Sequence, residues 1–131
     1  MATTDDGRSM STMATTLMCA DRLDEAEPLF REALARVKRN FGNAAVLLDD
    51  AAMVLALRGS IDDAARVSSC AEHVHDELGI SPRLASKLLR ERLRRRLTAE
   101  RSPDALQRLY EEGRGLSEDA AFALAFPAPA R

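Results

Sequence analysis

Apolar residues recur at steps of three and four along most of this chain, and no segment keeps a strict alternation of apolar and polar positions. The first pattern is typical of helices with one buried side, whereas alternation is typical of strands. The pattern therefore predicts an all-α fold without a sheet. We expect helices over residues 10–20, 24–40, 43–57, 60–78, 82–100, 103–113 and 117–126.

Start and stop signals support these boundaries. Asp24 is the expected N-cap of the second helix, and Pro28 is tolerable only because it is expected in the first turn. Ser81-Pro82 and Ser102-Pro103 pair a good capping residue with a good first helical residue. The expected breaks coincide with the internal glycines Gly42, Gly59, Gly79, Gly113 and Gly115.

A repeat is visible when the second expected helix is aligned with the fourth. Ala26 aligns with Ala64, and Ala33 with Ala71, at a common offset of 38 residues. In the second helix Phe30 lies between the two alanines, which gives small, large and small residues at spacings of four and three. These spacings keep all three on one helix face. Small residues let two helix backbones approach, and the larger one fills the gap beside them.

Residues 22–34, Arg-Leu-Asp-Glu-Ala-Glu-Pro-Leu-Phe-Arg-Glu-Ala-Leu, resemble the second helix of a tetratricopeptide repeat (TPR). Residues 43–79 are a looser match, because Ser68 stands where a bulky residue is usual and the offset exceeds the ~34 residues of the family. The resemblance implies antiparallel helix pairs in a short right-handed α-solenoid with a C-terminal helical cap. It also implies a non-catalytic protein-binding module without a cofactor.

Residues 60–126 are similar to the helical C-terminal region of LuxR-type and related STAND ATPase transcriptional regulators. The similarity rests on residues 64–67, 71–72, 78–79 and 110–117. In that family the region is a sensor or scaffold beside a nucleotide-binding engine and a DNA-binding domain. This sequence has no Gly-x-x-x-x-Gly-Lys-[Ser/Thr] loop to cradle phosphates. The resemblance therefore implies only the scaffold's binding role.

The expected organisation is a flexible N-terminus (1–9), one TPR-like domain (10–126) and a flexible tail (127–131). The domain contains pairs at about 10–41 and 43–79, followed by a degenerate third pair and cap over 82–126. A third pair is expected because such stacks usually need about three repeats for stability. A homodimer is expected for the same reason, since a short stack leaves apolar surface uncovered at its end.

Composition narrows the functional classes. Hydrophobic residues make up 46% and aromatic residues only 4%, so the core must be aliphatic. Cys19 and Cys70 lie far apart and form no metal-binding spacing, which favours reduced, buried thiols. No apolar run reaches the ~18 residues of a membrane span, and no signal-peptide pattern is present, so no membrane role and a cytoplasmic location are expected.

The candidate partner-binding groove follows from the TPR resemblance, because the first helix of each pair lines the concave face. The expected groove is apolar and acidic, which favours a protein or peptide partner in the form of a basic or amphipathic helix. The alternative is that these side chains face the chain's own C-terminal helix. The candidates are Arg8, Ser11, Thr12, Thr15, Met18, Val46, Asp49, Asp50, Met53, Ala56 and Leu57.

A second candidate is a basic patch on the fifth helix. Residues 82–101 contain eight basic and two acidic residues, although the whole chain has a net charge of −2. A solvated face, or pairing with acidic segments, is favoured over nucleic-acid binding because no aromatic residues interleave with the arginines. A small-molecule sensor with a dry pocket between helices is a further alternative. The patch consists of Arg90, Arg92, Arg94, Arg95 and Arg96.

No catalytic or metal-binding constellation stands out in the sequence. His73 and His75 are two residues apart and should point to different sides of a helix, where surface or interface roles are expected. His73 can share a face with Glu77, but two ligands do not make a zinc site.

Overall fold

The computed structural model describes residues 8–42, 44–81 and 84–127. Within these ranges every regular element is helical, and the all-α prediction is confirmed. The chain divides into two compact units, residues 1–47 and 48–131. The stacking of pairs into a solenoid within one domain stays a prediction. The elements are α1 (Arg8–Cys19), α2 (Leu23–Phe41), η1 (Ala45–Leu47), α3 (Leu48–Leu57), α4 (Ile61–Leu78), α5 (Leu84–Glu100), α6 (Pro103–Arg114) and α7 (Glu118–Ala125).

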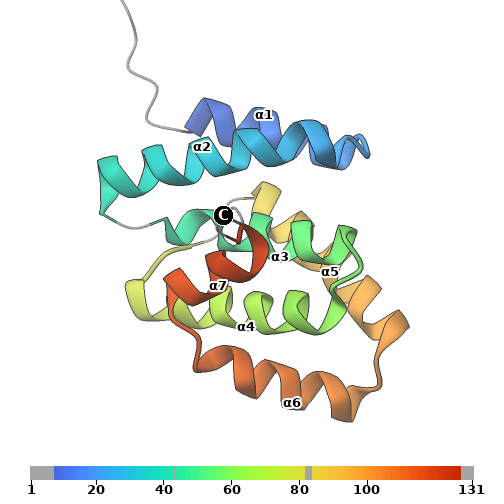
Figure 1. The fold of residues 1–131 in the computed structure, drawn as a ribbon. Helices are drawn as coiled ribbons and strands as arrows, with labels where there is room; N and C mark the ends of the chain where they lie inside the picture. Colours follow the sequence, from blue (N-terminus) through green and yellow to red (C-terminus); the bar gives the residue numbers. More distant parts are fainter. Residues whose placement is uncertain (1–7, 43, 82–83, 128–131) are drawn as a thin grey trace, which may run out of the picture. The chain divides into compact units, whose positions relative to one another are not determined.

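The first unit is built on the α1–α2 helix pair, in which α1 lies alongside α2 (Figure 1). Ala26 and Ala33 of α2 are fully buried, and Phe30 between them is 1% exposed. Ala14 and Met18 of α1 are buried as well. The small, large and small residues of α2 therefore lie in the interior, as their spacing predicts.

The start of α2 differs from the expectation. The helix begins at Leu23, and its N-cap position is occupied by Arg22, whose side chain makes no capping hydrogen bond. Asp24 instead lies in the first turn, where the helix dipole favours an acid. The end is as expected: Gly42 adopts the left-handed conformation (φ 79°), and its N–H donates to the carbonyl of Lys38.

The second unit is centred on the α3–α4 pair. Ala64 and Ala71 of α4 have no exposed surface. Ser60 occupies the N-cap position of α4 without a side-chain capping bond, and Gly79 ends the helix in the left-handed conformation. The recurring alanines therefore mark buried helix faces in both repeats.

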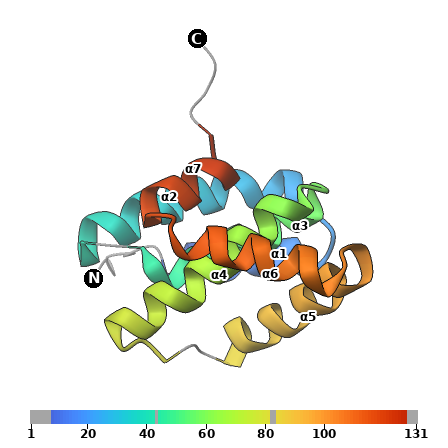
Figure 2. The ribbon, with the colours of Figure 1, turned by 90° about the horizontal axis from the view of Figure 1, so that it is seen from below.

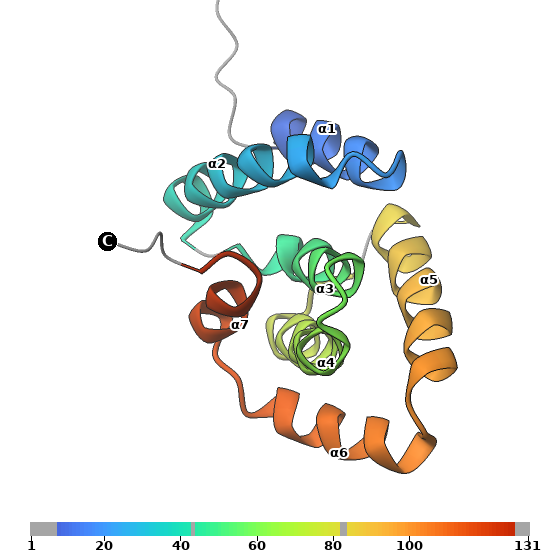
Figure 3. The same ribbon diagram turned by 45° about the vertical axis from the view of Figure 1, so that its right-hand side comes forward.

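The three remaining helices of the second unit surround this pair (Figure 3). Helix α5 packs mainly against α3, α6 packs against α4, and α7 contacts both. Figure 2 shows α6 crossing in front of the central pair and α5 as a different rod at the lower right. The expected third pair over 82–126 is thus not formed, because α5 and α6 each cover a different helix and barely touch one another. The expected Ser81-Pro82 start involves residues 82–83, which lie outside the described residues.

The last two helices begin with the predicted serine caps. The Ser102 hydroxyl accepts a hydrogen bond from the Ala105 N–H at 3.2 Å, and the Ser117 hydroxyl accepts one from the Ala120 N–H at 3.1 Å. Each serine satisfies a backbone donor that the first turn leaves without a helical partner. These two helix starts were readable from sequence because capping depends on residues close in the chain.

Helix α6 ends at Arg114, one residue beyond the expected end, with Gly115 at the C-cap, so Gly113 lies in its last turn. It is a buried residue within α6. A Cβ placed on Gly113 would lie 2.1 Å from the carbonyl oxygen of Arg66 on α4. Helix α6 can therefore approach the α4 backbone this closely only with glycine at that point. The same two helices are joined by the Ser69 hydroxyl, which donates to the Tyr110 carbonyl at 2.6 Å.

Candidate functional site

The α1 part of the expected groove is only partly accessible. Thr12 is exposed, whereas Ser11 and Thr15 are half-buried. Met18 is 1% exposed and belongs to the interior of the unit. The side chain of Arg8 lies outside the described residues. Sequence reasoning did not single out Met13, a neighbouring α1 residue that is 58% exposed.

The α3 part of the expected groove is largely interior. Asp49, Asp50 and Met53 are 2%, 8% and 3% exposed, and Ala56 has no exposed surface. Their burial leaves little accessible surface in this part of the expected groove. Val46 in η1 is 42% exposed, and Leu57 at the end of α3 is half-buried.

Asp49 is held in a network of three buried or half-buried side chains from three helices of the second unit. Arg90 on α5 donates from Nε to Oδ1 of Asp49 at 2.6 Å. Its Nη2 lies 2.7 Å from Nδ1 of His75 on α4. Because a guanidinium group only donates, Nδ1 is the acceptor in this contact. Asp49 Oδ2 has no hydrogen-bond partner among the described residues.

This network corrects the expectation for His75 and reassigns two candidate site residues. His75 is 3% exposed and is not a surface residue. Asp49 already has a cation, so its charge is not available to attract a basic partner. Arg90 belongs to the interior contact between α3, α4 and α5 and not to a basic surface patch. His73 is half-buried, and its Nε2 lies 2.6 Å from Glu77 Oε1 on the expected shared face.

The remaining arginines of the expected patch divide into paired and unpaired residues. Arg94 contacts Glu72 of α4 at 3.2 Å, and Arg96 contacts Glu100 of the same helix at 3.6 Å. Arg92 and Arg95 are exposed and form no ion pair within the described part of the chain. The basic segment therefore satisfies its charge partly internally, as the pairing alternative predicts.

The leucines of α5 do not form one buried stripe. Leu89, Leu93 and Leu97 are 6%, 2% and 1% exposed and lie in the interior. Leu84 and Leu88, in contrast, are 72% and 56% exposed. Sequence periodicity alone cannot show how wide a strip of α5 its neighbours cover.

Comparison with known families bears on the first unit. Residues 7–44 match the family model for the tetratricopeptide repeat. The match spans α1 and α2, where the small, large and small residues of α2 are buried. Neither the curated proteins nor the solved structures gave a match to the chain.

The TPR match supports a TPR-like helical protein and, in general, a module for protein–protein interaction. The family is generally non-catalytic. The match does not extend into residues 60–126, and no comparison supports their resemblance to LuxR-type or STAND regulators. None of the helices in the described ranges is long and apolar enough to cross a membrane.

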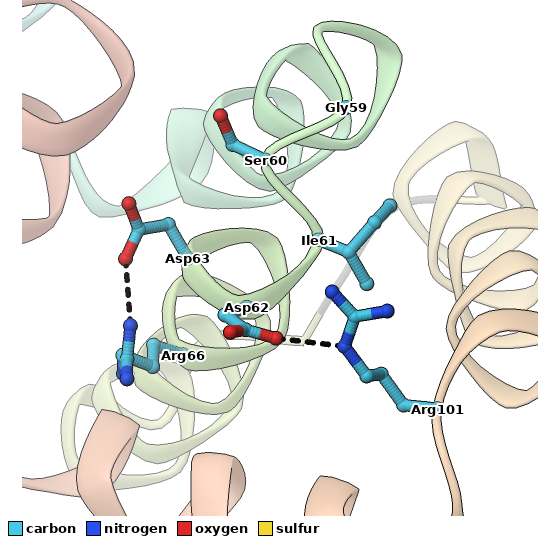
Figure 4. Close-up of a pocket in the computed structure, with 7 residues that line it drawn as sticks. All are labelled: Gly59, Ser60, Ile61, Asp62, Asp63, Arg66 and Arg101. Carbon is cyan, nitrogen blue, oxygen red and sulfur yellow. Dashed lines mark hydrogen bonds and ion pairs between the residues drawn. The ribbon is translucent and has the colours of Figure 1, made fainter.

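A shallow polar hollow lies at the start of α4 (Figure 4). The charged side chains that line it are paired with one another. Asp62 binds Arg101 at 2.9 Å, and Asp63 binds Arg66 at 2.8 Å. Arg66 also donates to Glu112 of α6 at 2.8 Å, and this hydrogen bond raises the pKa of the guanidinium above its ordinary value. The acids and bases that line the hollow thus neutralise one another and tie α4 to its neighbours.

Within the described residues, no group of three or more His, Cys, Asp or Glu side chains is placed to hold a metal ion. The cysteines differ from one another, contrary to expectation: Cys70 is buried, but Cys19 at the end of α1 is exposed. The Cys70 thiol is 3.5 Å from the Leu116 carbonyl, to which it donates.

We expect the two thiols to react at very different rates with a thiol-specific reagent at mildly alkaline pH. Burial raises the pKa of Cys70, with Glu118 adding in the same direction, so the reactive thiolate is scarce as well as inaccessible. One equivalent, at Cys19, should react rapidly in the native chain, and the second only after denaturant is added. Peptide mapping of the labelled chain checks this, and early label on Cys70 would contradict the buried position.

Proposed function

We propose that this chain is a non-catalytic protein-binding module of TPR type whose partner contacts the accessible face of α1. The observation that carries the proposal is the TPR match over residues 7–44, which coincides with a folded helix pair. Thr12 and Thr16 of α1 are exposed, and Met13 beside them is 58% exposed. The exposed side chains of Thr12, Met13 and Thr16 are all uncharged.

The chemistry of the α1 face refines the expected partner. The expectation of a basic helix depended on Asp49 and Asp50, both of which are buried. An amphipathic helix remains suitable, because its apolar side can cover Met13 while its polar side stays in water. The expected homodimer, a cytoplasmic location and a relation to bacterial transcriptional regulators remain part of the proposal. The regulator relation rests on the resemblance of residues 60–126 alone.

Site-specific photo-crosslinking tests this function. A photoreactive amino acid replaces Thr12 on α1 in the full chain, and a matched one replaces Arg108, an exposed residue of α6. We expect one protein to crosslink at position 12 and not at position 108. With that protein purified, Met13→Asp should weaken binding by roughly tenfold or more, because a charge would be buried against an apolar surface.

Two results would reject the proposal. One is crosslinking of the same protein at both positions with equal yield, which would indicate non-specific contact. The other is unchanged affinity of the purified partner for the Met13→Asp variant. Circular dichroism of that variant shows whether the helices are intact, and none of its effect should come from unfolding because Met13 is exposed.

A further inference from the structure

Helix α5 presents one stripe of side chains to the interior and a different stripe to solvent. Leu89, Leu93 and Leu97 form the interior stripe, at steps of four residues. On the opposite side, Leu84 and Leu88 occupy successive turns, and Arg92 and Arg95 continue the same line by steps of four and three. We call this the outer face of α5, and it comprises Leu84, Lys87, Leu88, Glu91, Arg92 and Arg95.

The apolar end of the outer face is exposed to solvent in the described part of the chain. Leu84 and Leu88 are 72% and 56% exposed, the first and third highest values among the exposed large hydrophobic residues of the described chain. Single exposed leucines are common on protein surfaces and need no explanation. Two on adjacent turns of one helix form a continuous apolar strip, which is typical of a surface that binds another protein.

The outer face carries more positive than negative charge. Lys87, Arg92 and Arg95 are exposed and form no ion pair within the described residues. The other arginines of α5 are all paired, with Asp49, Glu72 or Glu100. Glu91 is the one acid on the outer face, so three cations face a single carboxylate there. The outer face is therefore the part of α5 whose charge the chain leaves uncompensated.

We propose that the outer face of α5 docks an acidic amphipathic helix from another protein. Apolar residues of that helix would cover Leu84 and Leu88, and its carboxylates would meet Lys87, Arg92 and Arg95. Complementary charge sets the choice of partner and its register, while burial of the leucines supplies affinity. This site lies in the second compact unit, so it goes beyond the α1 surface described under the proposed function.

The chemistry of the face argues against two other occupants. A second copy docking through the same face would bring two sets of cations together across a two-fold axis. A nucleic acid would use the cations but would leave Leu84 and Leu88 without a contact, and α5 has no aromatic residue on which a base could stack. An acidic amphipathic helix is the occupant that uses both halves of the face.

The test uses labelled synthetic peptides and the full chain. The probe is a fluorescein-labelled helical peptide of about 18 residues, long enough to span α5, with leucines along one face and glutamates flanking them. One comparator replaces every glutamate with lysine, and the other replaces every leucine with serine. In fluorescence anisotropy titrations the acidic leucine peptide should bind at least roughly tenfold tighter than either comparator, and less tightly as salt increases.

Paired variants assign the binding to the outer face. Leu84→Ser with Leu88→Ser should reduce affinity for the acidic peptide by roughly tenfold or more. Arg92→Glu with Arg95→Glu should reverse the preference, so that the lysine peptide becomes the tighter ligand. The matched control is Arg108→Glu on α6, which makes the same charge change at an exposed cation elsewhere and should leave the affinity unchanged. All five positions are exposed, and circular dichroism verifies that each variant is folded.

Several outcomes would overturn the inference. Equal binding of the acidic and lysine peptides, or equal effects of the α5 variants and Arg108→Glu, would remove the charge argument. Loss of a dimer in sedimentation experiments with the α5 variants would identify a second copy as the occupant. Competition by duplex DNA that the leucine variants do not affect would identify a nucleic acid. Met13→Asp separates the two proposals, because it should leave peptide binding at α5 unchanged.

Discussion

Gly113→Ala should lower the free energy of unfolding by about 2 kcal/mol or more, although alanine is the better helix former by about 1 kcal/mol. The new Cβ would lie 2.1 Å from the Arg66 carbonyl oxygen and 2.8 Å from its carbonyl carbon. Both atoms belong to the backbone of α4, so no side chain can rotate away to make room. Helix α6 must shift outward, which weakens its packing on α4 and the Ser69–Tyr110 hydrogen bond.

Urea unfolding followed by tyrosine fluorescence measures this effect in the right part of the molecule. Tyr110 is the only tyrosine, the chain has no tryptophan, and Tyr110 lies in α6. Gly115→Ala is the matched control, because its Cβ would lie 3.5 Å from the Glu112 carbonyl, an ordinary contact distance. If neither Gly113→Ala nor the control Gly115→Ala lowered the free energy of unfolding, the close approach of α6 to α4 would be contradicted.

Arg90→Met is expected to destabilise the chain by about 3–5 kcal/mol, because it leaves the buried Asp49 carboxylate without a counter-charge. Asp49 is 2% exposed, and one of its oxygens already has no hydrogen-bond partner among the described residues. The same substitution removes the donor to Nδ1 of His75, which is 3% exposed. Denaturant unfolding followed by circular dichroism measures the loss.

The double variant Asp49→Leu with Arg90→Met separates the ion pair from simple packing. It should recover most of the stability, to within about 2 kcal/mol of the parent, because no buried charge then remains unpaired. Arg94→Met is the control, since the Arg94–Glu72 pair is solvent-exposed and should contribute about 1 kcal/mol or less. A double variant less stable than Arg90→Met alone would contradict the buried ion pair.

The local features of the fold were accessible from sequence. Helix starts at Ser102 and Ser117, and the left-handed end at Gly42, depend on groups within a few residues of each other along the chain. The burial of Ala26, Ala33, Ala64 and Ala71 was predictable for a related reason. A helix brings residues three and four apart onto one face, so the spacing of the alanines predicts which face packs.

The candidate site was less accessible, because periodicity shows which face of a helix can be buried and not what buries it. Asp49 and His75 lie 26 positions apart, and nothing in their spacing predicts that Arg90 joins them. The same limit explains the groove: Asp50 and Met53 have the sequence character of lining residues, yet they are only 8% and 3% exposed.

Sequence patterns were enough to predict that this protein is all helical, where most of its helices begin and end, and that residues 22–34 resemble a TPR second helix. The folded chain was needed to show that α5 and α6 cover different sides of the α3–α4 pair, that Gly113 is a point of contact, and that Leu84 and Leu88 remain exposed. Helix formation and capping are short-range effects, set by neighbouring residues. Which helix covers which face depends on long-range packing, where many surfaces of similar hydrophobicity compete.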